Sequence, residues 1–518
     1  MLAAAALLLV VSCSSTSAFA QRRRAASPVG NREWARGAIF YEIFVRSFFD
    51  SDGDGKGDFN GLTSKLDYVS SLGVDGIWLM PVFESPSYHG YDATDYETIA
   101  KDYGTNADFQ HFLEEAHKRG IRVILDFVMN HTSSQHPWFL DSASSPTSSK
   151  RNWYVWSATN PGWTQPWGPN QTWYLDNGAY YYGVFWSGMP DLNYRTQDVK
   201  SEMFRISREW LQKGVDGYRL DATRYLIEDG PGAGQYDTPE THQLLKDYSK
   251  DVQQTKPDAV LFAENTVDTA TLAVYYADGV MNFNFPLAGA IIDSVNSGDS
   301  TRITSTLRDM TNDYPPDAID APFLANHDHT RIATQLGNNA GKLRDAAAIL
   351  LTLPGAPFIY YGEEVGLQNG PTSADESKRT PMPWSASGGF TTGAPWFAYA
   401  PGLTQNNVAS ETNDPQSLLS YYRNWIVARK KSDALLRGSI TPLSSPASVL
   451  AFVRTSPSER VLVVHNLSNA TVTAGPFDVS ASALETIYAD NGVSTPSGAT
   501  RAWTMMLAPH TSGAWRVR

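Results

Sequence analysis

The feature that most constrains the fold is a long alternation of short apolar runs and amphipathic helical patterns between residues 38 and 435. Eight runs have the length and apolar character of buried strands: 38–48, 74–82, 122–130, 215–222, 259–265, 279–286, 321–328 and 357–366. Helical patterns fall between them, for example at 62–73, 106–120, 198–214, 342–353 and 418–431. The alternation predicts an α/β fold, a (β/α)8 TIM barrel. A doubly wound open sheet is the alternative, but no glycine-rich phosphate-binding motif follows any run.

Two regions depart from this alternation and divide the chain into predicted domains. The segment 131–194 is rich in Trp, Tyr, Pro, Ser and Asn and is too long for a structureless loop, so we expect a small inserted domain B there. After residue 437 the pattern changes to short alternating runs, which predict a C-terminal antiparallel β-sandwich domain at 437–518. The barrel is then formed by 31–130 and 195–436.

The first residues have the pattern of an export signal. The apolar run at 2–11 is too short to span a bilayer and resembles the core of such a signal. The residues before Cys13 resemble a lipobox, which would place a lipid on this cysteine, whereas Ala-Phe-Ala at 18–20 resembles a cleavage site. We therefore expect residues 1–30 to be a signal and tail, and the protein to be secreted or attached to the cell envelope. Cys13 is the single cysteine, which excludes an intramolecular disulfide.

The net charge limits the class of partner. A formal charge of -13 argues against a nucleic acid, which calls for a basic surface, and it suits a protein acting on a neutral polymer. The 15 Trp, 25 Tyr and 22 Phe residues offer flat faces for sugar rings, although large enzymes also hold many aromatic residues in their cores. We expect a monomer.

Polar side chains gather where four of the predicted strands end. In a barrel the carboxyl ends of all strands meet at one rim, where catalytic residues of such enzymes lie. A single carboxylate at a strand end is commonly a cap for the next helix, but four polar clusters in register indicate a site. The clusters are Asp126, Asn130 and His131; Arg219 and Asp221; Glu264 and Asn265; and Asn326, His327 and Asp328.

These segments resemble the ordered sequence motifs of the α-amylase family of glycoside hydrolases. A fifth motif of that family is matched by Met-Pro-Asp-Leu-Asn at 189–193, and the resemblance covers 38–435 and extends to the accessory domains. It implies that Asp221 is the nucleophile, that Glu264 is the general acid/base, and that Asp328 holds sugar hydroxyls and favours a distorted ring. A retaining enzyme places its two carboxyls about 5–5.5 Å apart. Glu264 must be protonated near neutral pH, so its pKa should be raised.

Further residues are expected to hold these acids or the sugar. Arg219 lies two residues before Asp221 and so faces the same side of the strand, where a cation keeps the carboxylate ionised; an interior ion pair with Asp126 is the compatible structural role. The resemblance implies that His131 and His327 bond to the sugar in the cleaved subsite. It also implies that Tyr91 stacks under this sugar and that His89 binds a neighbouring hydroxyl.

An acidic loop after the first predicted strand resembles an EF-hand calcium loop. Carboxylates occupy positions 1, 3, 5 and 9, a glycine position 6 and a backbone carbonyl position 7. The bidentate Glu of position 12 is absent, and an acidic surface turn is the alternative. We expect a structural Ca²⁺ ligated by Asp50, Asp52, Asp54, the carbonyl of Lys56, and Asp58.

A second calcium site of many α-amylases uses an Asn that matches Asn130 and the carbonyl of a His four residues after the nucleophile. Here that position is Tyr225, and Arg224 replaces the usual preceding Lys, so this second site stays open.

The resemblance is compatible with several activities on α-glucans. The 189–193 motif favours the cyclodextrin-cleaving and neopullulanase branch, and the acidic loop favours the oligo-1,6-glucosidase branch. The oligoglucosidases close the cleft with an Asp three residues before the stacking Tyr, where this chain has Tyr88. We therefore expect endo-hydrolysis of α-1,4 bonds in starch. The alternatives are a cyclomaltodextrinase or neopullulanase, an oligo-α-glucosidase with transglycosylation, and a non-catalytic relative.

Overall fold

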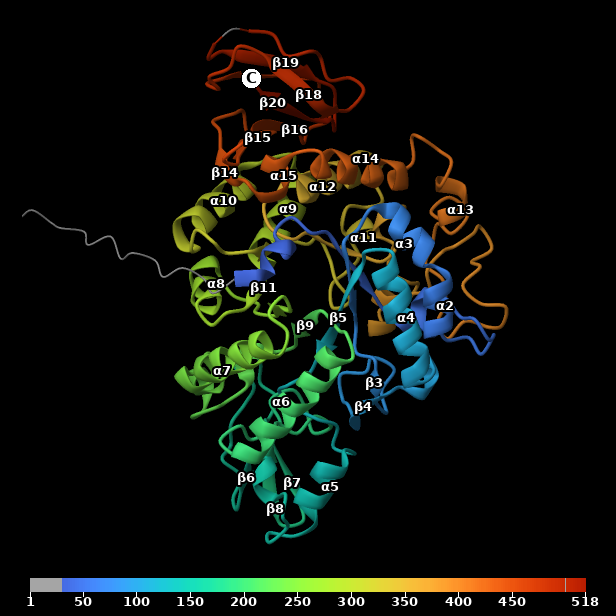
Figure 1. The fold of residues 1–518 in the computed structure, drawn as a ribbon, viewed down its shortest axis with the longest axis vertical. Coiled ribbons are helices and arrows are strands. Elements are labelled where there is room, and N and C mark those ends of the chain that lie inside the picture. Colours follow the sequence, from blue (N-terminus) through green and yellow to red (C-terminus); the bar gives the residue numbers. More distant parts are fainter. Residues whose placement is uncertain (1–29, 499) are drawn as a thin grey trace, which may run out of the picture.

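The computed structural model describes residues 30–498 and 500–518, so the predicted export signal and Cys13 lie outside the described residues. A barrel forms the middle of the molecule, and two groups of antiparallel strands lie at its opposite ends (Figure 1). Within the described residues, no helix combines the length and apolar character needed to cross a membrane.

Eight parallel strands form the barrel, as the sequence predicts. They pair in the order β12-β11-β10-β9-β5-β2-β1-β13, and a parallel bridge between Phe323 and Phe358 joins the two ends. The strands are buried almost throughout, which explains why they read as continuous apolar runs. Their bounds are β1 Phe40–Ile43, β2 Gly76–Leu79, β5 Arg122–Phe127, β9 Gly217–Leu220, β10 Val260–Ala263, β11 Met281–Phe283, β12 Asp320–Ala321 and β13 Phe358–Tyr360.

The helices between the strands turn apolar faces to the barrel. In α4 the buried side chains Phe109, Phe112, Leu113 and Ala116 recur at helical spacing, and a capping box of Thr105 and Asp108 starts the helix. The α-helices are α1 Val45–Phe48, α2 Phe59–Ser64, α3 Leu66–Leu72, α4 Asn106–Lys118, α5 Pro137–Ser144, α6 Gln197–Gln212, α7 Pro239–Thr255, α8 Thr269–Tyr276, α9 Phe285–Ser297, α10 Thr301–Asp313, α11 Ile332–Gln335, α12 Ala340–Thr352, α13 Val408–Glu411, α14 Leu418–Lys430 and α15 Asp433–Arg437.

Several predicted strand bounds were too long. The run 38–48 is a strand only over β1 and then becomes the helical turn α1, and the run 321–328 leaves the sheet after β12. Residues beyond these ladders are still buried, so their apolar character extends past the strand. The predicted helix at 62–73 is divided, since Lys65 ends α2 and precedes α3.

The segment after β5 holds a small three-stranded antiparallel sheet of β6 Trp156–Ser157, β7 Trp173–Asp176 and β8 Ala179–Tyr182, together with α5. Its buried cluster of Trp173, Tyr182 and Val184 packs against Phe185 and against Tyr225 of the 3-10 turn η4 (Thr223–Tyr225), which follows β9. The insertion is thereby anchored at the carboxyl rim of the barrel. A hairpin of β3 Phe83–Glu84 and β4 Asp95–Ile99 stands nearby on the same rim.

The C-terminal strands form two antiparallel sheets that share one apolar core. The larger sheet has the order β14-β15-β16-β20-β18 and the smaller one pairs β17 with β19. Phe477 and Trp503 from the small sheet and Leu462 and Trp515 from the large sheet belong to one buried cluster. The bounds are β14 Ser439–Pro442, β15 Val449–Thr455, β16 Arg460–Asn466, β17 Val472–Phe477, β18 Leu484–Ala489, β19 Trp503–Leu507 and β20 Ser512–Val517.

Candidate active site

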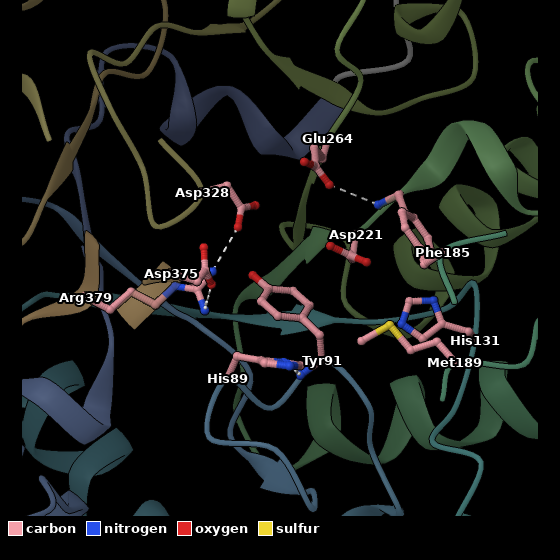
Figure 2. Close-up of a pocket in the computed structure, with 11 residues that line it drawn as sticks. His89, Tyr91, His131, Phe185, Met189, Asp221, Glu264, Asp328, Asp375 and Arg379 are labelled. Atoms are coloured by element: carbon pink, nitrogen blue, oxygen red, sulfur yellow. Dashed lines mark hydrogen bonds and ion pairs between the residues drawn. The ribbon is translucent and has the colours of Figure 1, made fainter. Parts of the chain in front are cut away.

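Three acids meet at the carboxyl rim because the strands that carry them are parallel. Asp221 directly follows β9, Glu264 directly follows β10, and Asp328 lies in the loop after β12. Their carboxyl groups face a common space above the ring of Tyr91 (Figure 2). This space is a cavity of about 260 Å³ lined by His89, Tyr91, His131, Phe185, Met189, Asp221, Ala222, Glu264, Asp328, Asp375 and Arg379.

Arg219 is the buried cation that holds these acids together. It is 1% exposed, and its Nη1 lies 2.6 Å from Asp221 Oδ1 and 2.9 Å from Asp126 Oδ1. Its Nη2 lies 2.8 Å from Glu264 Oε2. Both roles predicted from the sequence therefore occur together: the guanidinium pairs with Asp126 inside the barrel and also orients the two candidate catalytic carboxylates.

Glu264 lies in surroundings that favour its protonated form. Burial raises the pKa of this carboxyl, and the negative charges of Asp221 and Asp328 add to the effect against the opposing Arg219. The backbone N–H of Ala222 donates to Glu264 Oε2 at 3.2 Å. Ala222 adopts the left-handed φ of 50°, an uncommon conformation for a residue with a Cβ, and it directs this N–H toward the carboxyl.

Asp328 is held ionised by cations on two sides. Its Oδ2 lies 3.1 Å from His327 Nε2, and its Oδ1 accepts a hydrogen bond from Arg379 Nη2 at 3.0 Å. Burial alone would raise the pKa of Asp328, but the charge of His327 outweighs this effect and lowers the pKa. Burial would also lower the pKa of His327, but Asp328 and Glu42 outweigh it and raise this pKa to about 9. His327 is therefore a cation at neutral pH.

Tyr91 forms the floor of the cavity beneath the acids. Its hydroxyl donates to Asp126 Oδ2 at 2.9 Å and lies 2.5 Å from His327 Nε2, so the buried network fixes the ring. The rings of Tyr91 and His327 stack with centroids 5.3 Å apart. His89 lines the same cavity, and its Nδ1 accepts from the backbone N–H of Tyr91 at 3.1 Å.

His131 presents one unpaired nitrogen at this site. Its Nδ1 lies 2.9 Å from Asn130 Oδ1, whereas its Nε2 is buried without a protein partner. Burial lowers the pKa of His131 to about 4, so the ring is neutral at pH 7. With Nδ1–H bonded to an amide oxygen, Nε2 carries the lone pair of the neutral ring, and this nitrogen is buried at the edge of the cavity.

The cavity also contains residues that the sequence reasoning missed. Arg379 donates to the hydroxyl of Tyr88 at 2.9 Å and pairs with Asp375 Oδ2 at 2.9 Å, so the turn η7 (Asp375–Arg379) forms one wall. Phe185 lies across the Tyr91 ring from Arg379 and Asp375 (Figure 2). The position of η7 in a loop after the eighth strand was the one available signal, because every such loop reaches this rim.

The acidic loop after β1 brings together three of its five predicted ligands. One carboxylate oxygen each from Asp50, Asp52 and Asp58 lies within 4.8 Å of the others. The side chain of Asp54 is not part of this group, and Lys56 directs its ammonium to Asp102 at 2.8 Å, which leaves only its carbonyl as a candidate ligand. All these donors are oxygens, the type that Ca²⁺ prefers.

The region of the open second calcium site is bridged by protein atoms. Asn130 donates from Nδ2 to the carbonyl of Tyr225 at 2.7 Å and to Asp191 Oδ2 at 3.2 Å. Asn130 and the Tyr225 carbonyl, the two groups that would share a cation there, are thus bonded directly to each other.

Comparison with known proteins agrees with this geometry. The chain matches the family model for the alpha amylase catalytic domain over residues 42–438, and the model for the alpha-amylase SusG C-terminal domain over residues 449–512. It is similar to alpha-amylase 3 of Dictyoglomus thermophilum, 40% identical over 85% of this chain and 86% of that protein. It is also similar to an oligo-1,6-glucosidase of Heyndrickxia coagulans, 32% identical over 89% of this chain and 97% of that one.

Solved structures give the same result. An alpha-amylase from H. orenii superposes with a TM-score of 0.82 at 36% identity, covering 93% of this chain and 99% of that chain. The isomaltulose synthase SmuA from Protaminobacter rubrum superposes with a TM-score of 0.85 at 28% identity, covering 94% and 99%. The similarity thus spans the barrel, the insertion and the C-terminal sheets. The similar proteins differ in the sugar reactions that their names state.

Proposed function

Because the chain belongs to the α-amylase family of glycosidases, we propose that it hydrolyses internal α-1,4-glucosidic bonds of starch and related α-glucans with retention of the anomeric configuration. The observation that carries the proposal is the single guanidinium of Arg219 bonded to both Asp221 and Glu264 on one side of the cavity. The guanidinium fixes both carboxyl groups on the same side of the cavity. Burial of Glu264, with the charges of Asp221 and Asp328, raises its pKa against the opposing Arg219.

The first step forms a glycosyl-enzyme. Asp221 attacks the anomeric carbon while the bond from that carbon to the glycosidic oxygen breaks, and Glu264 gives its proton to the departing oxygen. Arg219 holds Asp221 in position through the hydrogen bond that its Nη1 donates to Oδ1. Tyr91 supports the sugar ring from below, and Asp328, held by His327 and Arg379, binds hydroxyls as the ring flattens.

The second step releases the sugar. Glu264, now a carboxylate, takes a proton from water, whose oxygen attacks the anomeric carbon and breaks its bond to Asp221. Two displacements on opposite faces restore the α configuration. His131 lines the cavity beside the sugar, and its ring stays neutral because burial lowers its pKa to about 4.

A second candidate is an oligo-α-glucosidase that acts from chain ends. It is favoured by the wall that Tyr88, Asp375 and Arg379 form on one side of the cavity, because such a wall limits how far a chain extends beyond the cleaved sugar. Endo-hydrolysis remains our choice because the side chain of Asp375 in this wall is 49% exposed, although that of Arg379 is only 4% exposed.

Products from starch, pullulan and a cyclodextrin, compared side by side, test the proposal. We expect the iodine colour of starch to fall well before reducing ends accumulate, and NMR to show the α anomer first. Glucose alone from chain ends would favour the second candidate, and the β anomer first would exclude the retaining mechanism.

We also propose that the acidic loop binds a structural Ca²⁺ through Asp50, Asp52 and Asp58, with Asp54 and the carbonyl of Lys56 as further ligands. Burial opposes ionisation of Asp50, but hydrogen bonds from Thr391 and from the backbone N–H groups of the loop lower its pKa. The loop thus holds charge that a hard divalent cation would balance. This ion would stabilise the loop and takes no part in the displacement steps.

Secretion, or attachment to the envelope through a lipid on Cys13, also remains our proposal. The apolar run at 2–11 supports export, and a starch polymer is an extracellular substrate. The intact mass of the mature protein distinguishes cleavage after residue 20 from lipidation.

A further inference from the structure

A second hollow lies where the barrel meets the C-terminal strands. Its volume is about 660 Å³, compared with about 260 Å³ for the catalytic cavity, and this is the size of a typical small-molecule site. Residues of α12 and α14 form one side, and the turn after β18 and the loop between β19 and β20 form the other. Figure 1 shows α12 and α14 beside the C-terminal strands, at the end of the barrel away from the insertion. The hollow shares no lining residue with the catalytic cavity.

The polar side chains of this hollow are held in place by both domains. Asp490 Oδ2 accepts hydrogen bonds from the hydroxyl of Tyr421 on α14 and from the first backbone N–H of β20, each at 2.8 Å. His510 has its Nδ1 2.6 Å from Asp345 Oδ2 on α12 and its Nε2 2.9 Å from Asn469 Oδ1. The barrel and the C-terminal sheets together thus fix these groups before any ligand arrives.

An aromatic ring and a guanidinium complete the lining. The ring of Tyr488 packs edge-on against Trp425 with centroids 4.8 Å apart, and the side chain is only half-buried. The guanidinium of Arg344 lies over the ring of Tyr421 at 5.3 Å, and its Nη2 donates to the carbonyl of Gln416. Because this is its only hydrogen bond to the described residues, its other donors stay available to a ligand.

The charges of the hollow favour a neutral ligand. Arg344 is balanced by Asp490, and His510 by its buried carboxyl partner, so an ion would meet no excess of the opposite charge. The amides of Asn424 and Asn491 add donors and acceptors to the same lining. Planar polar groups around a held aromatic ring suit a sugar, which offers hydroxyls at its edge and an apolar face to the ring.

The hollow opens on the side of the barrel that carries the catalytic cavity. In this fold each helix runs antiparallel to the strand before it, so the N-terminal ends of α12 and α14 lie toward the carboxyl rim. Gly341, at the start of α12, and Ser417, the N-cap of α14, both line the hollow. A chain held there can therefore continue toward the rim where the acids lie.

We propose that this hollow is a second, non-catalytic binding site for α-glucan chains, with Tyr488 as the residue that contacts the sugar ring and Arg344 and Asn424 as hydroxyl ligands. The inference rests on the proposed function. A polymer can touch the protein at two places at once, and a segment held in the hollow raises the local concentration of the rest of that chain at the catalytic rim. The site would thus favour starch over short oligosaccharides.

Binding is measured by affinity electrophoresis in gels that contain soluble starch. Every protein in this experiment also carries Glu264→Gln, so that the starch is not digested. For Tyr488→Ala and for Arg344→Ala we expect the apparent Kd for starch to rise about threefold or more, from the lost ring contact and the lost donors. Tyr488→Phe keeps the ring against Trp425 and should retain most of the affinity, which guards against a folding defect in Tyr488→Ala.

Activity with intact Glu264 separates the hollow from the catalytic cavity. Maltohexaose reaches the acids without being anchored elsewhere, so kcat/KM on it should stay within about twofold for Tyr488→Ala and Arg344→Ala. The rate of hydrolysis of starch granules should fall about threefold or more in the same two variants.

Met506 and Arg501 provide matched controls on the C-terminal sheets. Met506 is 55% exposed on β19, the side chain of Arg501 is 71% exposed, and neither residue lines the hollow. Met506→Ala and Arg501→Ala should match their parent enzymes in the gels and on both substrates.

Unchanged starch affinity in Arg344→Ala, or equal losses on starch granules and maltohexaose, would overturn the second site while leaving the proposed function intact. A wild-type enzyme that turns over neither substrate would contradict the proposed function. The gels need no turnover, so they still decide whether the hollow binds α-glucan.

Discussion

Two clusters of carboxylates follow strands of the same barrel, yet their charges are balanced in different ways. At the catalytic rim, side-chain cations contact the acids directly: Arg219 contacts Asp221 and Glu264, and Asp328 contacts His327 and Arg379. In the loop after β1, the ammonium of Lys56 bonds to Asp102 at 2.8 Å and lies 3.9 Å from Asp54, away from the group of Asp50, Asp52 and Asp58. There the carboxylates accept hydrogen bonds from the loop's own backbone, for example Asp50 from Gly53 and Gly55.

The difference shows what each cluster requires. The rim needs acids in unlike protonation states at fixed positions, which built-in cations and burial supply together. In the loop, one oxygen each from Asp50, Asp52 and Asp58 lies within 4.8 Å of the others, and the Ca²⁺ that we propose there would balance their charge. Changes at the rim should therefore act on rate and on the pH profile as well as on stability, and changes at the loop should act on stability alone.

The largest effect is expected for Glu264→Gln. Without the proton donor, kcat on maltohexaose should fall by about 10²–10⁴-fold, the usual contribution of a general acid. The rate constant of the first step with α-maltotriosyl fluoride should fall far less, because fluoride leaves without protonation. Stopped-flow release of fluoride measures this step, and equal losses on the two substrates would exclude Glu264 as the acid.

The next effect is expected for Arg219→Met, which removes the cation from the rim. Asp126, at 1% exposure, would lose its partner, and breaking a buried pair costs about 3–5 kcal/mol. Burial, with the charge of Asp221, already raises the pKa of Asp126 to about 7. The variant's carboxylate can protonate at low pH, so its loss of unfolding free energy should be larger at pH 8 than at pH 5.

Arg205→Met is the control for this variant, since Arg205 pairs with Glu202 and Glu209 and has a side chain that is 36% exposed. A surface network of this kind contributes little, so we expect a change below about 1 kcal/mol. Denaturant unfolding at the two pH values measures both variants. A loss for Arg219→Met that is independent of pH would contradict the account of Asp126.

A smaller effect is expected when calcium is removed. Free Ca²⁺ at about 100 times its Kd would stabilise the fold by about 2.7 kcal/mol, so a chelator should lower Tm without changing kcat at low temperature. Asp52→Asn should abolish this dependence, and Asp67→Asn, a change at an acid 87% exposed on α3, should keep it. A calcium-dependent kcat, or a Tm indifferent to chelation, would remove the contrast between the two clusters.

The smallest effect is a shift in the pH profile. The first step needs protonated Glu264, and burial raises its pKa above the ordinary value of 4.5. As pH rises through this raised pKa, the proton is lost and kcat/KM should decline. The alkaline decline of kcat/KM should therefore have its midpoint at a pH clearly above 4.5. If kcat/KM on maltohexaose declines with a midpoint at or below pH 4.5, Glu264 is not held neutral.

The fold and the acids could be predicted from the sequence because both depend on local patterns. Buried parallel strands read as apolar runs, and their ends place Asp221 and Glu264 at the rim. The strand bounds could not be predicted as well, since the residues after β1 and β12 remain buried outside the sheet. Apolar residues indicate which segments are buried, but they do not indicate where the backbone hydrogen bonds of a strand end.

Two parts of the site depend on packing that no local pattern specifies. Arg379 reaches Asp328 only through the path of the loop after β13. Phe185 and Tyr225 meet only because the insertion folds back onto the turn after β9. In the sequence these residues stand among many aromatic and charged neighbours, and the contacts that distinguish them are long-range.

Trapping the covalent intermediate tests the central claim most directly. In Glu264→Gln, α-maltotriosyl fluoride should still form the glycosyl-enzyme, while the missing base slows its hydrolysis. The intact mass should rise by one maltotriosyl group, and peptide mapping should place it on Asp221. No adduct, or an adduct on Asp328, would contradict the assignment of Asp221 as nucleophile and Glu264 as acid/base.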